Sequence, residues 1–159
     1  RGESADIMVV RLAVEKARAA DAGTGTVVLA ADTAVVLDGE VFGKPADRAD
    51  ALRMLAALSG RHHQVMTGVA VRSDNAMENV LSVTDVKFRE IGPDEALDYW
   101  HSGEPRDKAG AYAIQGLAGT FVETITGSYT GVVGLPVLET AELLRAAGIE
   151  LSAELKDEI

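Results

Sequence analysis

The feature that most constrains this chain is a carboxylate, Asp32, in the middle of a largely apolar run. Residues 26–31 and 34–37 are apolar apart from Thr26 and are rich in β-branched side chains. Such a run is typical of a strand that is covered on both faces. Burying a carboxylate there is unfavourable unless it is paired or coordinated. Asp32 is therefore either a structural group that caps a turn or nearby backbone, or a functional group held on a strand.

An Asp-Gly pair at 38–39 predicts a two-residue hairpin turn directly after this strand. Counting back from the turn places Thr33 opposite Lys44. Asp32, Thr33 and Lys44 would then gather at the same end of the hairpin. A carboxylate that can hold a divalent ion, with lysines nearby, is typical of polyphosphate chemistry.

Periodicity and capping residues predict alternating helices and strands along the rest of the chain. The expected helices cover about 5–21, 48–58 and 93–102 and a last segment from Pro136, and the expected long strands cover 63–72 and 77–89. Residues 103–134 are punctuated by glycines, which favours short strands and tight loops. The pattern predicts one α/β domain with a mixed sheet over residues 1–159.

Three further residues are candidates for a site, and each has a plain structural alternative. Lys16 interrupts the apolar side of the first helix, where a lysine usually extends its ammonium to solvent at the edge of a core. Lys108 lies in a basic, glycine-containing loop that could simply be solvated. Gln115 lies between an isoleucine and a glycine, so its amide either bonds backbone or contacts a ligand.

Composition excludes several classes of function. The chain has no cysteine, which excludes disulfides, thiol catalysis and cysteine-ligated zinc. A formal net charge of −10 argues against non-specific binding to nucleic acid or to anionic membranes, although not against a local cationic pocket. No apolar run is long enough to cross a bilayer. Walker A, Gly-x-Gly-x-x-Gly and Gly-x-Ser-x-Gly patterns do not occur.

A series of short motifs resembles the Maf family of nucleoside triphosphate pyrophosphatases. In chain order they are Arg11-Leu12-Ala13 with Lys16-Ala17, Ala31-Asp32-Thr33, Gly43-Lys44-Pro45, Leu58-Ser59-Gly60, Thr67-Gly68-Val69, Asp107-Lys108-Ala109-Gly110-Ala111-Tyr112, Ile114-Gln115-Gly116 and Val133-Gly134-Leu135-Pro136. Each motif is weak by itself, but eight in one order extend over residues 5 to 150.

The resemblance implies an elongated α/β fold with a mixed sheet, similar to that of inosine triphosphate pyrophosphatases. It implies a cytoplasmic enzyme, expected as a homodimer, that splits a nucleoside triphosphate into monophosphate and pyrophosphate with Mg²⁺ or Mn²⁺. By the family's usual length, about 40 residues are expected before Arg1, including a Ser-x-Ser-Pro-Arg-Arg loop that grips the triphosphate.

Carried over residue by residue, the resemblance makes Asp32 the general base and a possible metal ligand. Lys16, Lys44 and Lys108 would neutralise phosphate charge. Thr33 and Gln115 fall at positions associated with base selectivity, and a glutamine at 115 is typical of the dTTP- and UTP-hydrolysing branch.

Two other functions are compatible with the same residues. One is a nucleotide-binding regulator of cell division that keeps the nucleotide cleft but does not hydrolyse the nucleotide. The other is a purine-specific inosine triphosphatase on the same fold. Pyrophosphate release from dTTP separates the first from the enzyme, and a comparison of dITP with dTTP separates the second.

Overall fold

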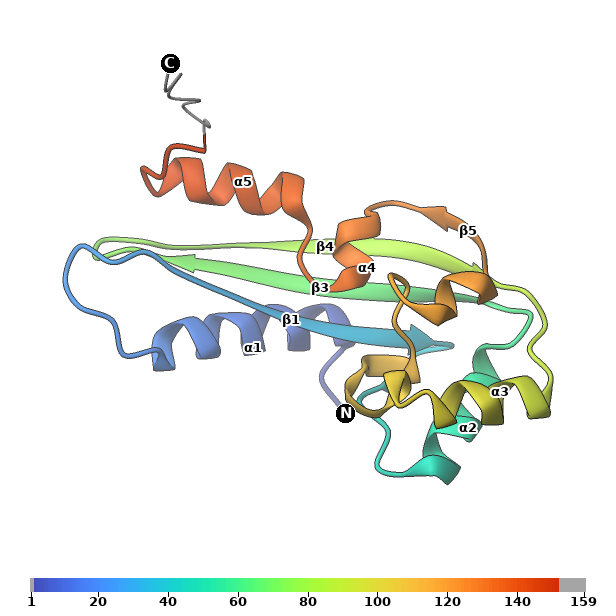
Figure 1. Ribbon diagram of the computed structural model, residues 1–159. Helices are drawn as coiled ribbons and strands as arrows, with labels where there is room; N and C mark the ends of the chain where they lie inside the picture. Colours follow the sequence, from blue (N-terminus) through green and yellow to red (C-terminus); the bar gives the residue numbers. More distant parts are fainter. Residues whose placement is uncertain (1, 152–159) are drawn as a thin grey trace, which may run out of the picture.

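A computed structural model describes residues 2–151 of the chain. A five-stranded sheet in the order β2-β1-β3-β4-β5 forms its centre. In Figure 1, α1 lies along one face of the sheet, α4 and α5 lie on the other, and α2 and α3 pack at one end. The strands are β1 (Val28–Leu37), β2 (Glu40–Phe42), β3 (His62–Arg72), β4 (Met77–Phe88) and β5 (Val122–Thr126). The helices are α1 (Ala5–Ala19), α2 (Arg48–Leu58), α3 (Pro93–His101), α4 (Tyr129–Val133) and α5 (Val137–Ala146).

The predicted α/β class is confirmed, and the sheet within residues 2–151 is antiparallel throughout, where a mixed sheet was expected. Tight connections explain the direction of the strands. The β1–β2 and β3–β4 pairs are each joined by a short turn, and such a turn can only link antiparallel neighbours. Among the described residues, no helix is long and apolar enough to span a membrane.

The predicted hairpin turn at 38–39 is confirmed. Asp38 and Gly39 have φ values of 50° and 83°, the positive pair that a type I′ turn requires. Leu37 pairs with Glu40 as this turn dictates. The ladder ends two residues further on, so the expected pairing of Thr33 with Lys44 does not form.

The short reach of β2 leaves an open edge on β1. The last β1–β2 pair is Val35 with Phe42, and the chain then turns away at Gly43. Residues 28–34 of β1 therefore have a strand neighbour only on the β3 side, where Thr33 pairs with Thr67. The two halves of β1 also differ in burial. Residues 34–37 are buried, whereas residues 28–33 are partly or fully exposed.

Helix α1 approaches the sheet closely because β3 carries a glycine beneath it. A Cβ on Gly68 would lie 2.5 Å from the backbone oxygen of Val9, so any larger residue would push the helix away. Small residues continue this contact, since Ala13 and Ala17 pack against Ala70. Gly68 is also the cross-strand partner of Asp32, so the same contact brings α1 next to that carboxylate.

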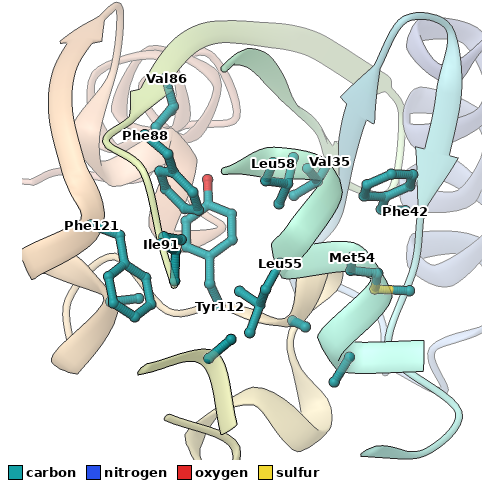
Figure 2. Packing of buried hydrophobic residues seen from close by; sticks show 14 of the residues in the cluster. Val35, Phe42, Met54, Leu55, Leu58, Val86, Phe88, Ile91, Tyr112 and Phe121 are labelled. Carbon is teal, nitrogen blue, oxygen red and sulfur yellow. The ribbon is translucent and has the colours of Figure 1, made fainter. Parts of the chain in front are cut away.

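An aromatic core closes one end of the sheet. Figure 2 shows Phe88 of β4 beside Tyr112, with Leu55 of α2 and Phe121 nearby. The rings of Phe88 and Tyr112 meet edge to face with centroids 4.7 Å apart. His63 is buried in the same cluster, with Nε2 2.8 Å from the Tyr112 hydroxyl.

Residues 103–134 differ in part from the expectation of short strands and tight loops. Strand β5 is present, but three 3₁₀ turns precede it, at Glu104–Asp107, Ala109–Ala111 and Leu117–Phe121. Helix α4 was not expected, since its Thr-Gly-Val-Val sequence has low helix propensity. The Ser128 side chain stabilises it as an N-cap by accepting a hydrogen bond from Gly131 N at 3.0 Å.

Candidate functional site

A cleft of about 440 Å³ wraps around the open edge of β1. Residues from α1, β1, the loop after β2, the 3₁₀ turns and α4 line it. All six residues predicted from the sequence line this one cleft: Lys16, Asp32, Thr33, Lys44, Lys108 and Gln115. The structure therefore brings together side chains that are up to 99 positions apart in the chain (115 − 16 = 99).

Lys16 and Asp32 form an ion pair on the α1 side of the cleft. Lys16 Nζ lies 2.5 Å from Asp32 Oδ1 and donates a second hydrogen bond, of 3.1 Å, to the backbone oxygen of Ala31. The Asp32 side chain is 19% exposed and that of Lys16 is 54% exposed. Among residues 2–151, no group donates a hydrogen bond to Asp32 Oδ2. One oxygen of this carboxylate is thus held by a cation and the other remains able to accept a proton.

Two loops bring the other lysines of the cleft together. Gly110 N donates to the Gly43 oxygen at 3.0 Å, which joins the loop carrying Lys108 to the loop carrying Lys44. Asp107 lies with them, and its carboxylate is 3.1 Å from Lys108 Nζ. A hydrogen bond from Lys108, together with the charges of Lys108 and Lys44, lowers the pKa of Asp107.

The cleft is cationic although the chain is strongly acidic. Its charged lining within residues 2–151 consists of three lysines and the carboxylates Asp32 and Asp107, so the formal sum is 3 − 2 = +1. The whole chain carries −10. An anion is therefore attracted to this cleft more than to the surrounding surface.

The loop that carries Gln115 is held in place by Glu104. This carboxylate accepts hydrogen bonds from the Tyr99 hydroxyl at 2.6 Å, from Leu117 N at 3.0 Å and from Ala118 N at 3.3 Å. Burial alone would raise the pKa of Glu104, but these donors outweigh it and the pKa is lowered. A Cβ on Gly116 would collide with the Glu104 carboxylate, so the glycine beside Gln115 permits this contact.

Thr33 faces the opposite side of β1 from Asp32, as neighbouring strand residues must. Its Oγ1 lies 2.9 Å from Oγ1 of Thr67, its cross-strand partner. Thr67 is fully buried and also donates to the backbone oxygen of Gly131 in α4 at 2.8 Å. The side chains that line the cleft thus form two groups, one on each side of the β1 edge.

The carboxylates of the cleft suit a metal that arrives with a polyphosphate. No cluster of three or more histidine, cysteine or acidic side chains that could cage a metal occurs within residues 2–151. Mg²⁺ is commonly bound by one or two carboxylates together with substrate phosphates. The partly exposed Asp32 meets that need, and Asp107 is a second oxygen donor on the same cleft.

Sequence reasoning assigned no role to three residues that support the site. Asp107 was seen only as part of a basic loop, although its place beside Lys108 was visible. Glu104 and Thr67 act behind the residues that line the cleft. Thr67 and Asp107 belong to the family motifs, and Glu104 belongs to none. Their contacts depend on the cross-strand register and the loop path, which the sequence does not show.

Comparison with known proteins gives consistent matches. The family described as Maf-like protein matches residues 1–147. A protein of Bordetella parapertussis named dTTP/UTP pyrophosphatase is 62% identical over 122 residues, which cover 77% of this chain and 59% of that protein. Proteins of the same name from Anaeromyxobacter sp. and Anaeromyxobacter dehalogenans are 58% and 54% identical over 153 and 157 residues. These matches cover 92% and 96% of this chain and 73% and 79% of the two relatives. The chain thus spans about three fifths of the length of the Bordetella protein.

Proposed function

The chain belongs to the Maf family, and on that premise we propose that it hydrolyses dTTP and UTP to the nucleoside monophosphate and pyrophosphate. The observation that carries the proposal is the Lys16–Asp32 pair in a cationic cleft whose other lysines come from two separate loops. The names of the relatives supply the nucleotide class. The reaction transfers an oxygen of water to phosphorus, breaks the bridge between the α- and β-phosphates and releases pyrophosphate.

The lysines support the phosphate half of this proposal. A triphosphate carries several negative charges, and attack on its phosphorus requires that charge to be neutralised and the groups to be positioned. Lys16 reaches the cleft from α1, while Lys44 and Lys108 reach it from loops joined by the Gly110–Gly43 hydrogen bond. We assign all three to the phosphates. Lys16 has a second role, since it orients the carboxylate of Asp32.

Asp32 is proposed to take the proton of the attacking water. Its Oδ1 is fixed by Lys16, and Oδ2 is the oxygen that can accept the proton. A Mg²⁺ or Mn²⁺ ion bound with the triphosphate would neutralise phosphate charge and make a bound water more acidic. Asp32 is the residue that would hold such an ion, and Asp107 is the other carboxylate of the described cleft lining.

Thr33 and Gln115 are assigned to the base. Both line the cleft, and Thr33 points to the side of β1 opposite the Lys16–Asp32 pair. The Gln115 amide offers both a donor and an acceptor, which matches the carbonyl, N–H and carbonyl of a uracil or thymine edge. The Glu104 contacts hold the backbone next to Gln115 and limit where its amide can reach.

The proposal is tested by the identity of the released products. The protein with Mg²⁺ is incubated with dTTP, UTP, dITP and dGTP, and pyrophosphate and inorganic phosphate are measured separately. We expect monophosphate and pyrophosphate in equal amounts, with dTTP and UTP the best substrates. A preference for dITP would favour the inosine triphosphatase. Nucleotide binding without product would favour the non-catalytic regulator.

A further inference from the structure

The hydrogen bonds behind Thr33 fix the direction of its hydroxyl proton. A threonine hydroxyl has one proton to donate and lone pairs that accept. Thr67 Oγ1 contacts both the Gly131 carbonyl oxygen, at 2.8 Å, and Thr33 Oγ1, at 2.9 Å. A carbonyl oxygen can only accept, so the single proton of Thr67 is used on Gly131. The Thr33–Thr67 bond then forms only if Thr33 is the donor.

A ligand in the cleft therefore finds the Thr33 hydroxyl as a hydrogen-bond acceptor. Its proton is used on the buried Thr67, so Oγ1 of this cleft-lining residue has only lone pairs left to offer a ligand. An acceptor in a partly enclosed site binds N–H or O–H groups and is left unpaired by another acceptor.

We propose that Thr67 is a positioning residue for base selectivity, because it makes Thr33 an obligate acceptor for the N3–H of a uracil or thymine base. This inference rests on the proposed function. The pairing edge of an imide base has two carbonyl acceptors and one donor, N3–H. An acceptor-only Thr33 that contacts this edge can bond only that donor. Cytosine carries a lone pair at N3 in place of the proton. In the same pose, this acceptor would face the acceptor oxygen of Thr33.

The test removes the Thr67 hydroxyl, which accepts the proton of Thr33, and keeps the shape of the Thr67 side chain. In Thr67→Val the Thr33 hydroxyl is free to turn and donate into the cleft, so it can bond cytosine N3. The Gly131 oxygen still receives Gly134 N at 3.1 Å, which helps the variant to fold. Thr67→Ser keeps the hydroxyl and is the matched control.

The measured quantity is the ratio of kcat/KM for CTP to that for UTP. We expect Thr67→Val to raise this ratio about tenfold or more, partly through a real gain for CTP, since an unpaired polar group costs on the order of that factor. Thr67→Ser should keep the wild-type ratio. An unchanged ratio in Thr67→Val would overturn the proposal, as would a rise of the same size in Thr67→Ser.

A second pair of variants keeps the proposal testable if Thr67→Val does not fold. Thr33→Ser retains the donated proton and should keep the preference for UTP, whereas Thr33→Val should lose it. A Thr33→Val variant with the wild-type ratio contradicts the proposal. Calorimetric binding of UMP and CMP to the same variants needs no turnover. A wild type that hydrolyses no triphosphate but binds UMP over CMP in this pattern refutes the proposed function and retains the assignment of Thr67.

Discussion

Lys16 of α1 and Asp32 of β1 meet with 2.5 Å between Nζ and Oδ1, although 15 residues separate them in the chain (32 − 16 − 1 = 15). The contact explains two oddities of the sequence together. A lysine on the apolar side of a helix and a carboxylate in an apolar strand are each unfavourable alone, but here each is the partner of the other. Gly68 makes the contact possible by letting α1 lie against β3.

Removing a cleft lysine is expected to damage catalysis more than stability. Lys16→Ala and Lys44→Ala should each lower kcat/KM for dTTP on the order of 10²-fold, since each removes a cation from developing phosphate charge. Thermal unfolding should change far less than activity, because the Lys16 side chain is 54% exposed and its removal lets water reach the Asp32 carboxylate.

Lys87→Ala is the matched control for these variants. Lys87 is paired with Glu123 at 2.6 Å and lies outside the cleft lining. Its removal should leave kcat/KM unchanged. Full activity in the folded fraction of Lys16→Ala, combined with a large loss of stability, would show that Lys16 has a structural role.

Gln115→Glu should reverse part of the base preference. A carboxylate has no proton to offer the carbonyl groups of uracil or thymine, so hydrolysis of dTTP and UTP should fall. A guanine edge presents donors at N1 and N2, so dGTP should lose less. The readout is the ratio of kcat/KM for dTTP to that for dGTP. A ratio equal to that of the wild type would show that Gln115 does not contact the base.

Glu104→Gln should loosen the loop that carries Gln115. The side chain keeps its length but turns one acceptor into a donor that faces the Leu117 amide or the Tyr99 hydroxyl. The free energy of unfolding should fall by about 1–3 kcal/mol, as expected when a partly buried donor loses its partner. Selectivity between dTTP and dGTP should fall as well. Wild-type stability together with wild-type selectivity would exclude a positioning role for Glu104.

Stability should depend on pH through His63. Burial lowers the pKa of His63 from 6.5 to about 4, so the folded protein holds this ring neutral. Between these values the unfolded chain binds the proton and the folded one does not. The contribution of His63 to the free energy of unfolding is therefore fully present above pH 6.5 and is lost as the pH falls to about 4. The difference between the two pKa values corresponds to about 3 kcal/mol.

Urea unfolding at several pH values between 4 and 7 measures this contribution. His63→Gln should remove it and flatten the curve in that interval. His101→Gln is the control, because His101 is exposed at the end of α3 and is not among the groups that shift the pKa of His63. Equal slopes in wild type and His63→Gln would mean that His63 does not titrate differently in the folded state.

Local signals in the sequence predicted local structure well. The Asp-Gly turn predicted the register in which Leu37 pairs with Glu40. The helix expected over 48–58 is present as α2, and Asp47 caps it by accepting a hydrogen bond from Asp50 N at 2.9 Å. These features depend on a few consecutive residues, whose conformational preferences are strong. The same reasoning failed for α4, because a weak helix former is held there by Ser128 and by the distant Thr67.

The sequence predicted six residues that the fold brings to one cleft, but not the contacts between them. All six residues line the cleft, yet the Lys16–Asp32 pair and the Thr33–Thr67 bond were not foreseen. Both depend on how α1 and β3 pack against β1, which involves residues far apart in sequence. Periodicity indicates which face of an element is apolar, but it does not say which element covers that face.

Asp32 is proposed to take the proton in a hydrolysis that releases pyrophosphate. Pyrophosphate release from dTTP with Mg²⁺, compared between wild type and Asp32→Asn, tests it most directly, with Asp98→Asn as an exposed control outside the cleft lining. The amide keeps the shape but accepts no proton, so kcat should fall about 10²- to 10⁴-fold. The midpoint of thermal unfolding should stay close to that of the wild type. Turnover above half of the wild-type value in Asp32→Asn would show that Asp32 is a structural carboxylate and not the general base.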